Sequence, residues 1–76
     1  MTQFEPIQQV PQIIRIKQLV MIVGLSRSTI YEMINPDSPR YESTFPKPIK
    51  LGARAVGWIL EDINLWLLYK SKSQVG

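Results

Sequence analysis

Residues 24–31, GLSRSTIY, carry the strongest local signals of structure in this chain. Gly24 stands where the end of a helix favours a residue in the left-handed conformation. Ser26 is a good N-cap residue, because its hydroxyl can accept a hydrogen bond from a free N–H group in the first turn of a helix. Leu25 and Ile30 have the spacing of a hydrophobic staple around that cap. The stretch therefore predicts two helices joined by a tight turn.

The residues on either side predict both helices. Residues 13–16 are β-branched at three of four positions, which favours a brief extended segment, and residues 17–23 carry a broad apolar stripe at helical spacing. The second helix is expected from Arg27 to about Asn35, because two Xaa-Pro pairs follow it. Residues 36–44 then form a polar loop without periodicity.

The rest of the chain predicts a hairpin and a third helix. Residues 49–51 and 55–59 alternate in character, and the glycine-containing segment 52–54 between them is typical of a hairpin loop. Residues 60–69 are expected to be helical. The apolar face of this helix consists of Leu60, Ile63, Trp66 and Leu67.

Two pairs of residues are better explained by structure than by chemistry. Trp58 is in phase with the apolar positions of the hairpin and Trp66 with those of the last helix, so we expect both indoles in the core. Glu61 and Asp62 are adjacent on a helix, so their carboxylates point about 100° apart and cannot converge on one bond. In the first turn they complement the helix dipole instead.

Together these elements predict a mainly α-helical fold with a small β-hairpin, which is a winged helix-turn-helix. We expect a flexible N-terminal arm over residues 1–12, which are rich in glutamine and proline. The winged helix-turn-helix domain is expected over residues 13–70 and a frayed C-terminal tail over residues 71–76.

The composition excludes several functions. The chain has 76 residues and contains neither cysteine nor histidine. Disulfides, zinc sites of the usual Cys/His kind and Ser-His or Cys-His catalytic pairs are therefore excluded, and we expect no metal, no cofactor and no enzymatic activity. No apolar run approaches the roughly 20 residues of a membrane span, and the first residues do not resemble a signal peptide. We expect a cytoplasmic protein without a membrane partner.

Positive charge is concentrated in the middle of the chain. The net charge is +3, but residues 15–54 carry seven basic and three acidic side chains, which makes +4. Residues 1–14 have a net charge of −1 and residues 55–76 are neutral. An acidic partner is therefore expected to bind the middle of the chain.

The second predicted helix has an outer face suited to contact with DNA. At about 100° per residue, Ile30, Met33 and Ile34 gather on one side. The other side carries groups that can reach base edges and phosphates. Arg27 is mildly unfavourable at a helix N-terminus, which indicates a role beyond the helix itself. The candidate DNA-contacting residues of this helix are Ser26, Arg27, Ser28, Thr29, Tyr31, Glu32 and Asn35.

Three basic residues on or beside the hairpin are further candidates for contact with DNA. Lys50 alternates with Ile49 and Leu51, so it faces away from the core. Arg54 stands at the tip of the turn, where a wing meets the minor groove or the backbone, and Lys47 precedes the hairpin. The alternative for all three is an ordinary contribution to solubility.

Four blocks follow one another along this sequence: GLSRSTIY (24–31), FPKPIKLG (45–52), RAVGW (54–58) and the DIxxWL pattern (62–67). In this order they resemble the AlpA family of small phage and prophage regulators. The resemblance implies a winged helix-turn-helix similar to excisionase and MerR-type DNA-binding domains. It also implies a role in the biology of mobile elements, either control of integrase-linked genes or excisionase-like help to an integrase.

The chain departs from the family pattern in two places. Residues 35–44 form a longer segment than the short glycine-bearing turn of the family, and Glu32 stands on the outer helix face, where a basic residue is common. A carboxylate repels phosphate, but it can accept a hydrogen bond from the amino group of cytosine. Glu32 therefore bears on the target sequence more than on the mode of binding.

The sequence favours a sequence-specific regulator of a prophage or integrative element that binds double-stranded DNA. It would act as a transcriptional regulator, as an excisionase-like recombination directionality factor, or as both. We expect a monomer that binds repeated DNA sites cooperatively and head to tail, with an integrase as a further partner. The alternative is a protein-interaction module, an inhibitor or adaptor of a regulator or integrase, that uses the same fold without binding DNA. Glu32 and the acidic residues of the 36–44 loop favour this alternative.

Overall fold

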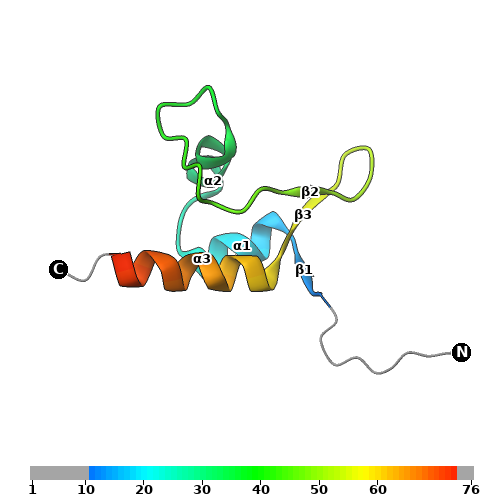
Figure 1. Cartoon of the computed structure of the whole chain (residues 1–76). Coiled ribbons are helices and arrows are strands. Elements are labelled where there is room, and N and C mark those ends of the chain that lie inside the picture. The colour runs from blue at the N-terminus through cyan, green and yellow to red at the C-terminus, as the bar shows by residue number, and fades with distance from the viewer. Residues whose placement is uncertain (1–10, 74–76) are drawn as a thin grey trace, which may run out of the picture.

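The structure, a computed structural model, describes residues 11–73. Helices and short strands follow one another along this part of the chain (Figure 1). They are β1 (Ile13–Ile14), α1 (Ile16–Val23), α2 (Arg27–Ile34), β2 (Ile49–Lys50), β3 (Val56–Ile59) and α3 (Leu60–Ser73). This arrangement confirms the predicted fold class, a mainly helical winged helix-turn-helix with a small hairpin.

A tight turn joins α1 to α2, as residues 24–31 predict. Gly24 adopts a φ of 76°, and its N–H donates to the carbonyl of Val20 at 2.9 Å. The hydroxyl of Ser26 accepts a hydrogen bond from the N–H of Thr29 at 3.2 Å, so it caps α2. The bounds of both helices agree with the predicted ones to within one residue.

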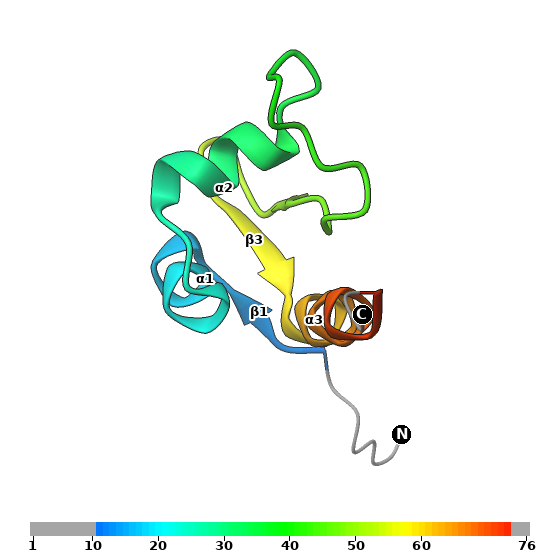
Figure 2. The same cartoon turned by 90° about the vertical axis from the view of Figure 1, so that its left-hand side faces the viewer.

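β3 is the central strand of a three-stranded antiparallel sheet with the order β1-β3-β2 (Figure 2). Ile14 of β1 pairs with Trp58 on one side of β3, and Ile49 of β2 pairs with Gly57 on the other. β2 and β3 are the predicted hairpin. The predicted extended segment before α1 becomes a third strand, because its β-branched residues reach the free side of β3.

The core takes apolar side chains from all three helices, from β1 and β3 and from the segment before β2. Trp58 is fully buried, and the ring of Trp66 packs edge-on against Phe45 with centroids 4.8 Å apart. Both indoles therefore belong to the core, as predicted. The buried residues are Ile14, Leu19, Ile30, Met33, Phe45, Trp58, Ile63 and Trp66.

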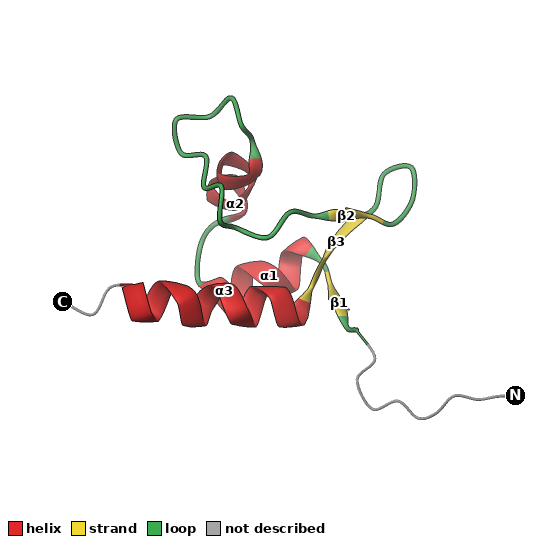
Figure 3. Cartoon of the chain, viewed as in Figure 1, coloured by secondary structure: helices red, strands yellow, loops and turns green. Residues whose placement is uncertain are grey.

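The loop of residues 36–44 is part of a long connection between α2 and β2 (Figure 3), and it is attached to two helices. The N–H of Glu42 donates to the carbonyl of Met33 at 2.9 Å, which ties the loop to α2. The carboxylate of Glu42 lies 3.5 Å from Nζ of Lys70 in α3 and accepts a hydrogen bond from the hydroxyl of Thr44. These contacts hold the loop beside both helices.

α3 is longer than the sequence indicated. It continues to Ser73, whereas the predicted end was Tyr69. In its last turns the hydroxyls of Ser71 and Ser73 donate to backbone carbonyls at 2.9 and 3.1 Å, and two lysines complement the helix dipole. The helix thus includes residues 71–73 of the predicted tail, and residues 74–76 lie outside the described part of the chain.

The predicted arm of residues 1–12 lies almost entirely outside the described residues. At its end, the carbonyl of Gln12 accepts a hydrogen bond from the N–H of Leu60 at 2.8 Å. This contact attaches the chain just before β1 to the start of α3. The boundary between arm and domain stays a prediction.

The close packing at Gly57 gives a first prediction. A Cβ atom at this position would lie 2.5 Å from Cγ2 of Ile13 and 3.1 Å from the carbonyl oxygen of Ile14, whereas a Cβ at Gly52 in the hairpin loop would meet nothing within 4 Å. We expect Gly57→Ala to lower the free energy of unfolding by about 1–3 kcal/mol through overpacking. The matched control Gly52→Ala should stay within about 0.5 kcal/mol of the original protein. Urea unfolding followed by tryptophan fluorescence measures both, and equal stability of the two variants would contradict the packing argument.

The contacts of Glu42 give a second prediction. The hydrogen bond from Thr44 and the positive charge of Lys70 outweigh partial burial and lower the pKa of the Glu42 carboxyl from its ordinary value. A carboxylate with a lower pKa in the folded than in the unfolded state stabilises the fold above its unfolded pKa, and this contribution disappears as the pH falls through the folded pKa. Glu42→Gln should therefore lower the melting temperature near neutral pH. The difference should shrink below about pH 4, and a difference that is constant across this range would contradict the assignment.

Candidate nucleic-acid interface

α2 exposes the face that the sequence predicts for contact with DNA. Ile30 and Met33 are buried on its inner side. Tyr31 on its outer side is 42% exposed. The other predicted residues of this face that the structure exposes are Ser26, Arg27, Ser28, Glu32 and Asn35.

The hydroxyl groups at the start of α2 interact with one another. Ser26 Oγ donates to Thr29 Oγ1 at 2.9 Å and lies 3.3 Å from Ser28 Oγ, while it also accepts from the N–H of Thr29. Thr29 is only partly exposed. Ser26 and Thr29 therefore stabilise the first turn of the helix, and Ser28 is an exposed residue whose hydroxyl lies beside that of Ser26.

The end of α2 is engaged by the loop that follows. Oε1 of Glu32 lies 3.3 Å from Nε of Arg40 in the loop. Oδ1 of Asn35 accepts a hydrogen bond from the N–H of Asp37 at 3.0 Å, which forms a local turn. The sequence did not point to Arg40, because the loop has no periodicity from which its direction could be predicted. The one feature of the sequence that could have drawn attention to Arg40 is that it is the single arginine in a loop longer than the corresponding turn of the family.

The three basic residues predicted around the hairpin fall into two groups. Lys50 lies in β2 and Arg54 in the loop between β2 and β3, and both are exposed. Lys47 instead faces the 36–44 loop, where its Nζ donates to the Tyr41 hydroxyl at 3.1 Å and lies 5.4 Å from the centre of that ring. Lys47 therefore belongs to the loop rather than to the hairpin.

α2, the 36–44 loop and the hairpin lie on the same side of α3 in both views of the molecule (Figures 1 and 2). Within residues 11–73, Arg27 and Arg54 form no ion pair, so their charges are not compensated by a contact. Arg15, by contrast, donates from Nε to the carbonyl of Val56 at 2.9 Å and joins the start of α1 to β3. Some basic residues of the middle of the chain are thus exposed and form no ion pair with another described residue, whereas Arg15 forms a contact that helps to hold the fold together.

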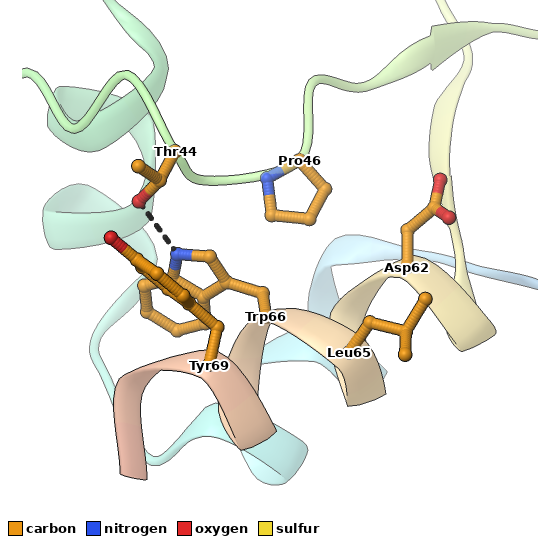
Figure 4. Close-up of a pocket in the computed structure, with 6 residues that line it drawn as sticks. All are labelled: Thr44, Pro46, Asp62, Leu65, Trp66 and Tyr69. Atoms are coloured by element: carbon orange, nitrogen blue, oxygen red, sulfur yellow. Dashed lines mark hydrogen bonds between the residues drawn. The ribbon is translucent and has the colours of Figure 1, made fainter. Parts of the chain in front are cut away.

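An open hollow lies on a different part of the surface, between α3 and residues 44–46 (Figure 4). One of its sides is the indole of Trp66, whose Nε1 donates to Thr44 Oγ1 at 3.1 Å. None of the predicted DNA-contacting residues lines it; its lining residues are Thr44, Pro46, Asp62, Leu65, Trp66 and Tyr69. Among residues 11–73, no three Asp or Glu side chains gather in a group that could hold a metal ion.

The helices give no sign of a membrane span. In the part of the chain that the structure describes, none of them is both long enough and apolar enough to cross a bilayer.

Comparisons with known proteins show which sequences this chain resembles. The family described as Prophage CP4-57 regulatory protein (AlpA) matches residues 12–70. The DNA-binding transcriptional activator AlpA of Escherichia coli (strain K12) is 44% identical over 61 residues, which cover 80% of this chain and 87% of that protein. The uncharacterized protein ORF88 of Enterobacteria phage P4 is 31% identical over 67 residues, which cover 82% of this chain and 69% of that protein. No solved structure matches the chain.

The family match spans every helix and strand of the structure except the last turn of α3. It contains all four blocks that carry the resemblance in the sequence, and the Escherichia coli relative is similar over most of both chains. The chain therefore belongs to the AlpA family of prophage regulatory proteins.

Proposed function

We propose that this protein is a sequence-specific regulator that binds double-stranded DNA and controls transcription in a prophage or integrative element. The observation that carries the proposal is the exposed polar face of α2, together with a hairpin that exposes Lys50 and Arg54. A relative described as a DNA-binding transcriptional activator supports the same class of function. Such a regulator acts on DNA in the bacterial cytoplasm and needs no cofactor and no catalytic group.

We propose that α2 enters the major groove, which is wide enough to admit an α-helix. Arg27 is suited to a bidentate contact with guanine, because its guanidinium forms no ion pair within residues 11–73. Tyr31 and Ser28 have accessible hydroxyls for bases or phosphates. The proposed contacts of this segment are Ser26, Arg27, Ser28, Thr29, Tyr31, Glu32 and Asn35.

The hairpin supplies the second part of the proposed interface. Arg54 at its tip meets the minor groove or the backbone, and Lys50 meets a phosphate, since both side chains are exposed. Lys47 extends this basic surface toward the 36–44 loop. Phosphate contacts of this kind set affinity and register, whereas the contacts of α2 with base edges set the sequence preference.

A single small module buries about 600–1,000 Å² of protein surface on DNA and binds weakly alone. We therefore propose that a protein that is monomeric in solution binds repeated sites cooperatively, head to tail. The same helix and hairpin suit an excisionase-like recombination role, in which an integrase is the further partner.

The proposal predicts salt-dependent binding to the promoter or attachment site of the element. Arg27→Ala and Arg54→Ala should each weaken binding by about 1–3 kcal/mol if each residue makes a good base contact. Fluorescence anisotropy with labelled duplexes at two salt concentrations measures this loss. The control Lys72→Ala removes the same charge from the end of α3 and should bind like the original protein.

Two results would count against the proposal. Binding without salt dependence would exclude the phosphate contacts, and unchanged affinity in both arginine variants would exclude the assigned face. A pulldown that recovers one protein partner while no DNA is retained at low salt would favour the protein-interaction module instead.

A further inference from the structure

The ion pair between Glu32 of α2 and Arg40 of the 36–44 loop needs an explanation other than stability. Nε of Arg40 lies 3.3 Å from Oε1 of Glu32, and the two side chains are 66% and 48% exposed. Ion pairs this exposed contribute little to the free energy of unfolding. The pair is therefore a weak stabiliser, yet it fixes an arginine beside the proposed recognition helix.

The geometry of the pair leaves most of the guanidinium accessible. Arginine has five N–H donors, and the contact with Glu32 engages Nε. The two terminal nitrogens belong to a side chain that is two-thirds exposed. A guanidinium in this position can donate two parallel hydrogen bonds to a phosphate while the carboxylate holds it from the other side.

The backbone of Arg40 is also held in place. Its N–H donates to Ser38 Oγ at 3.1 Å, and the N–H of Tyr41 donates to the carbonyl of Ser38 at 3.0 Å. The hydroxyl of Tyr41 accepts from Lys47, so a second basic group lies against the residue next to Arg40. The N–H of Glu42 ties the same part of the loop to the end of α2. The loop thus presents Arg40 from a defined position.

We propose that Arg40 is a further DNA-contacting residue, which binds a backbone phosphate beside the groove that α2 enters, and that Glu32 positions it. The proposal rests on the proposed function, because it assumes that α2 faces DNA. The inference thus refines the role of Glu32 among the proposed contacts of α2: it acts through Arg40 and not by a contact of its own with cytosine. Its negative charge is compensated at 3.3 Å, which explains how a carboxylate is accommodated on a surface that meets phosphates.

A double variant that conserves the net charge tests this assignment. Arg40→Ala removes a positive charge and Glu32→Gln removes a negative one, so the combination has the net charge of the original protein. Affinity for a preferred duplex is measured between about 50 and 200 mM salt. Arg40→Ala should reduce the slope of log K against log salt by about 0.9, the value for one phosphate contact. The double variant should keep that reduced slope.

Two matched variants show whether a reduced slope comes from loss of the contact between Arg40 and a phosphate or from loss of a positive charge anywhere in the protein. Arg40→Lys keeps the charge and should keep the slope, and Lys72→Ala loses a charge at the end of α3 and should also keep it. The preferred sequence of Glu32→Gln is selected from randomised duplexes, because a changed base at one position would reveal a direct contact of Glu32. Circular dichroism melting curves show whether each variant is folded.

Three results would overturn the inference, and each would do so for a different reason. If the double variant regains the original affinity and slope, Arg40 only neutralises Glu32. If Glu32→Gln changes the preferred base at one position, Glu32 contacts that base and does not serve to position Arg40. If the original protein shows no salt-dependent binding to any duplex, the proposed function fails, and the inference fails with it.

Discussion

The indole of Trp58 is fully buried in β3, the strand to which β1, β2 and α3 are all attached. Burial of about 200 Å² of aromatic surface is worth roughly 5 kcal/mol at about 25 cal/mol per Å². Nε1 of Trp58 has no hydrogen-bond partner within residues 11–73, which costs about 1–3 kcal/mol. The gain from burying the indole surface is therefore larger than the cost of the missing hydrogen bond. In a chain of 76 residues without disulfides, a single side chain therefore contributes a large share of the stability.

The same strand fixes the geometry of the proposed interface. Ile14 pairs with Trp58 and is followed within two residues by α1, which the turn at Gly24 joins to α2. On the other side of β3, Gly57 pairs with Ile49 in β2, so the pairing with β3 also sets the position of the hairpin. The helix and the hairpin are thus placed by one rigid element, and a surface that is organised before binding loses less conformational entropy when it meets DNA.

The features that were predictable from the sequence are set by contacts between near neighbours. The glycine turn, the Ser26 cap and the hairpin each depend on residues a few positions apart, and the structure has all three. The pairing of β1 with β3 and the contact of Glu42 with Lys70 join segments separated by a large part of the chain, and no local pattern encodes them. The hydrogen bonds within the last turns of α3 are local, but serine is too common in loops to predict them. The exposed face of α2 could be predicted because helical periodicity is strict, whereas the direction of Arg40 could not, since a loop has no period.

The structure also changes the meaning of the charge count. The sum of +4 over residues 15–54 gives equal weight to Arg15, which is bonded to the backbone of β3, and to Arg40, which faces the carboxylate of Glu32. Charges such as Arg27 and Arg54 act differently, because they are exposed and form no ion pair within residues 11–73. Screening limits the reach of a surface charge to about 10 Å at 0.1 M salt. The exposure of these few uncompensated side chains therefore matters more for binding to DNA than the sum of charges, and the small net charge of the chain is no argument against such binding.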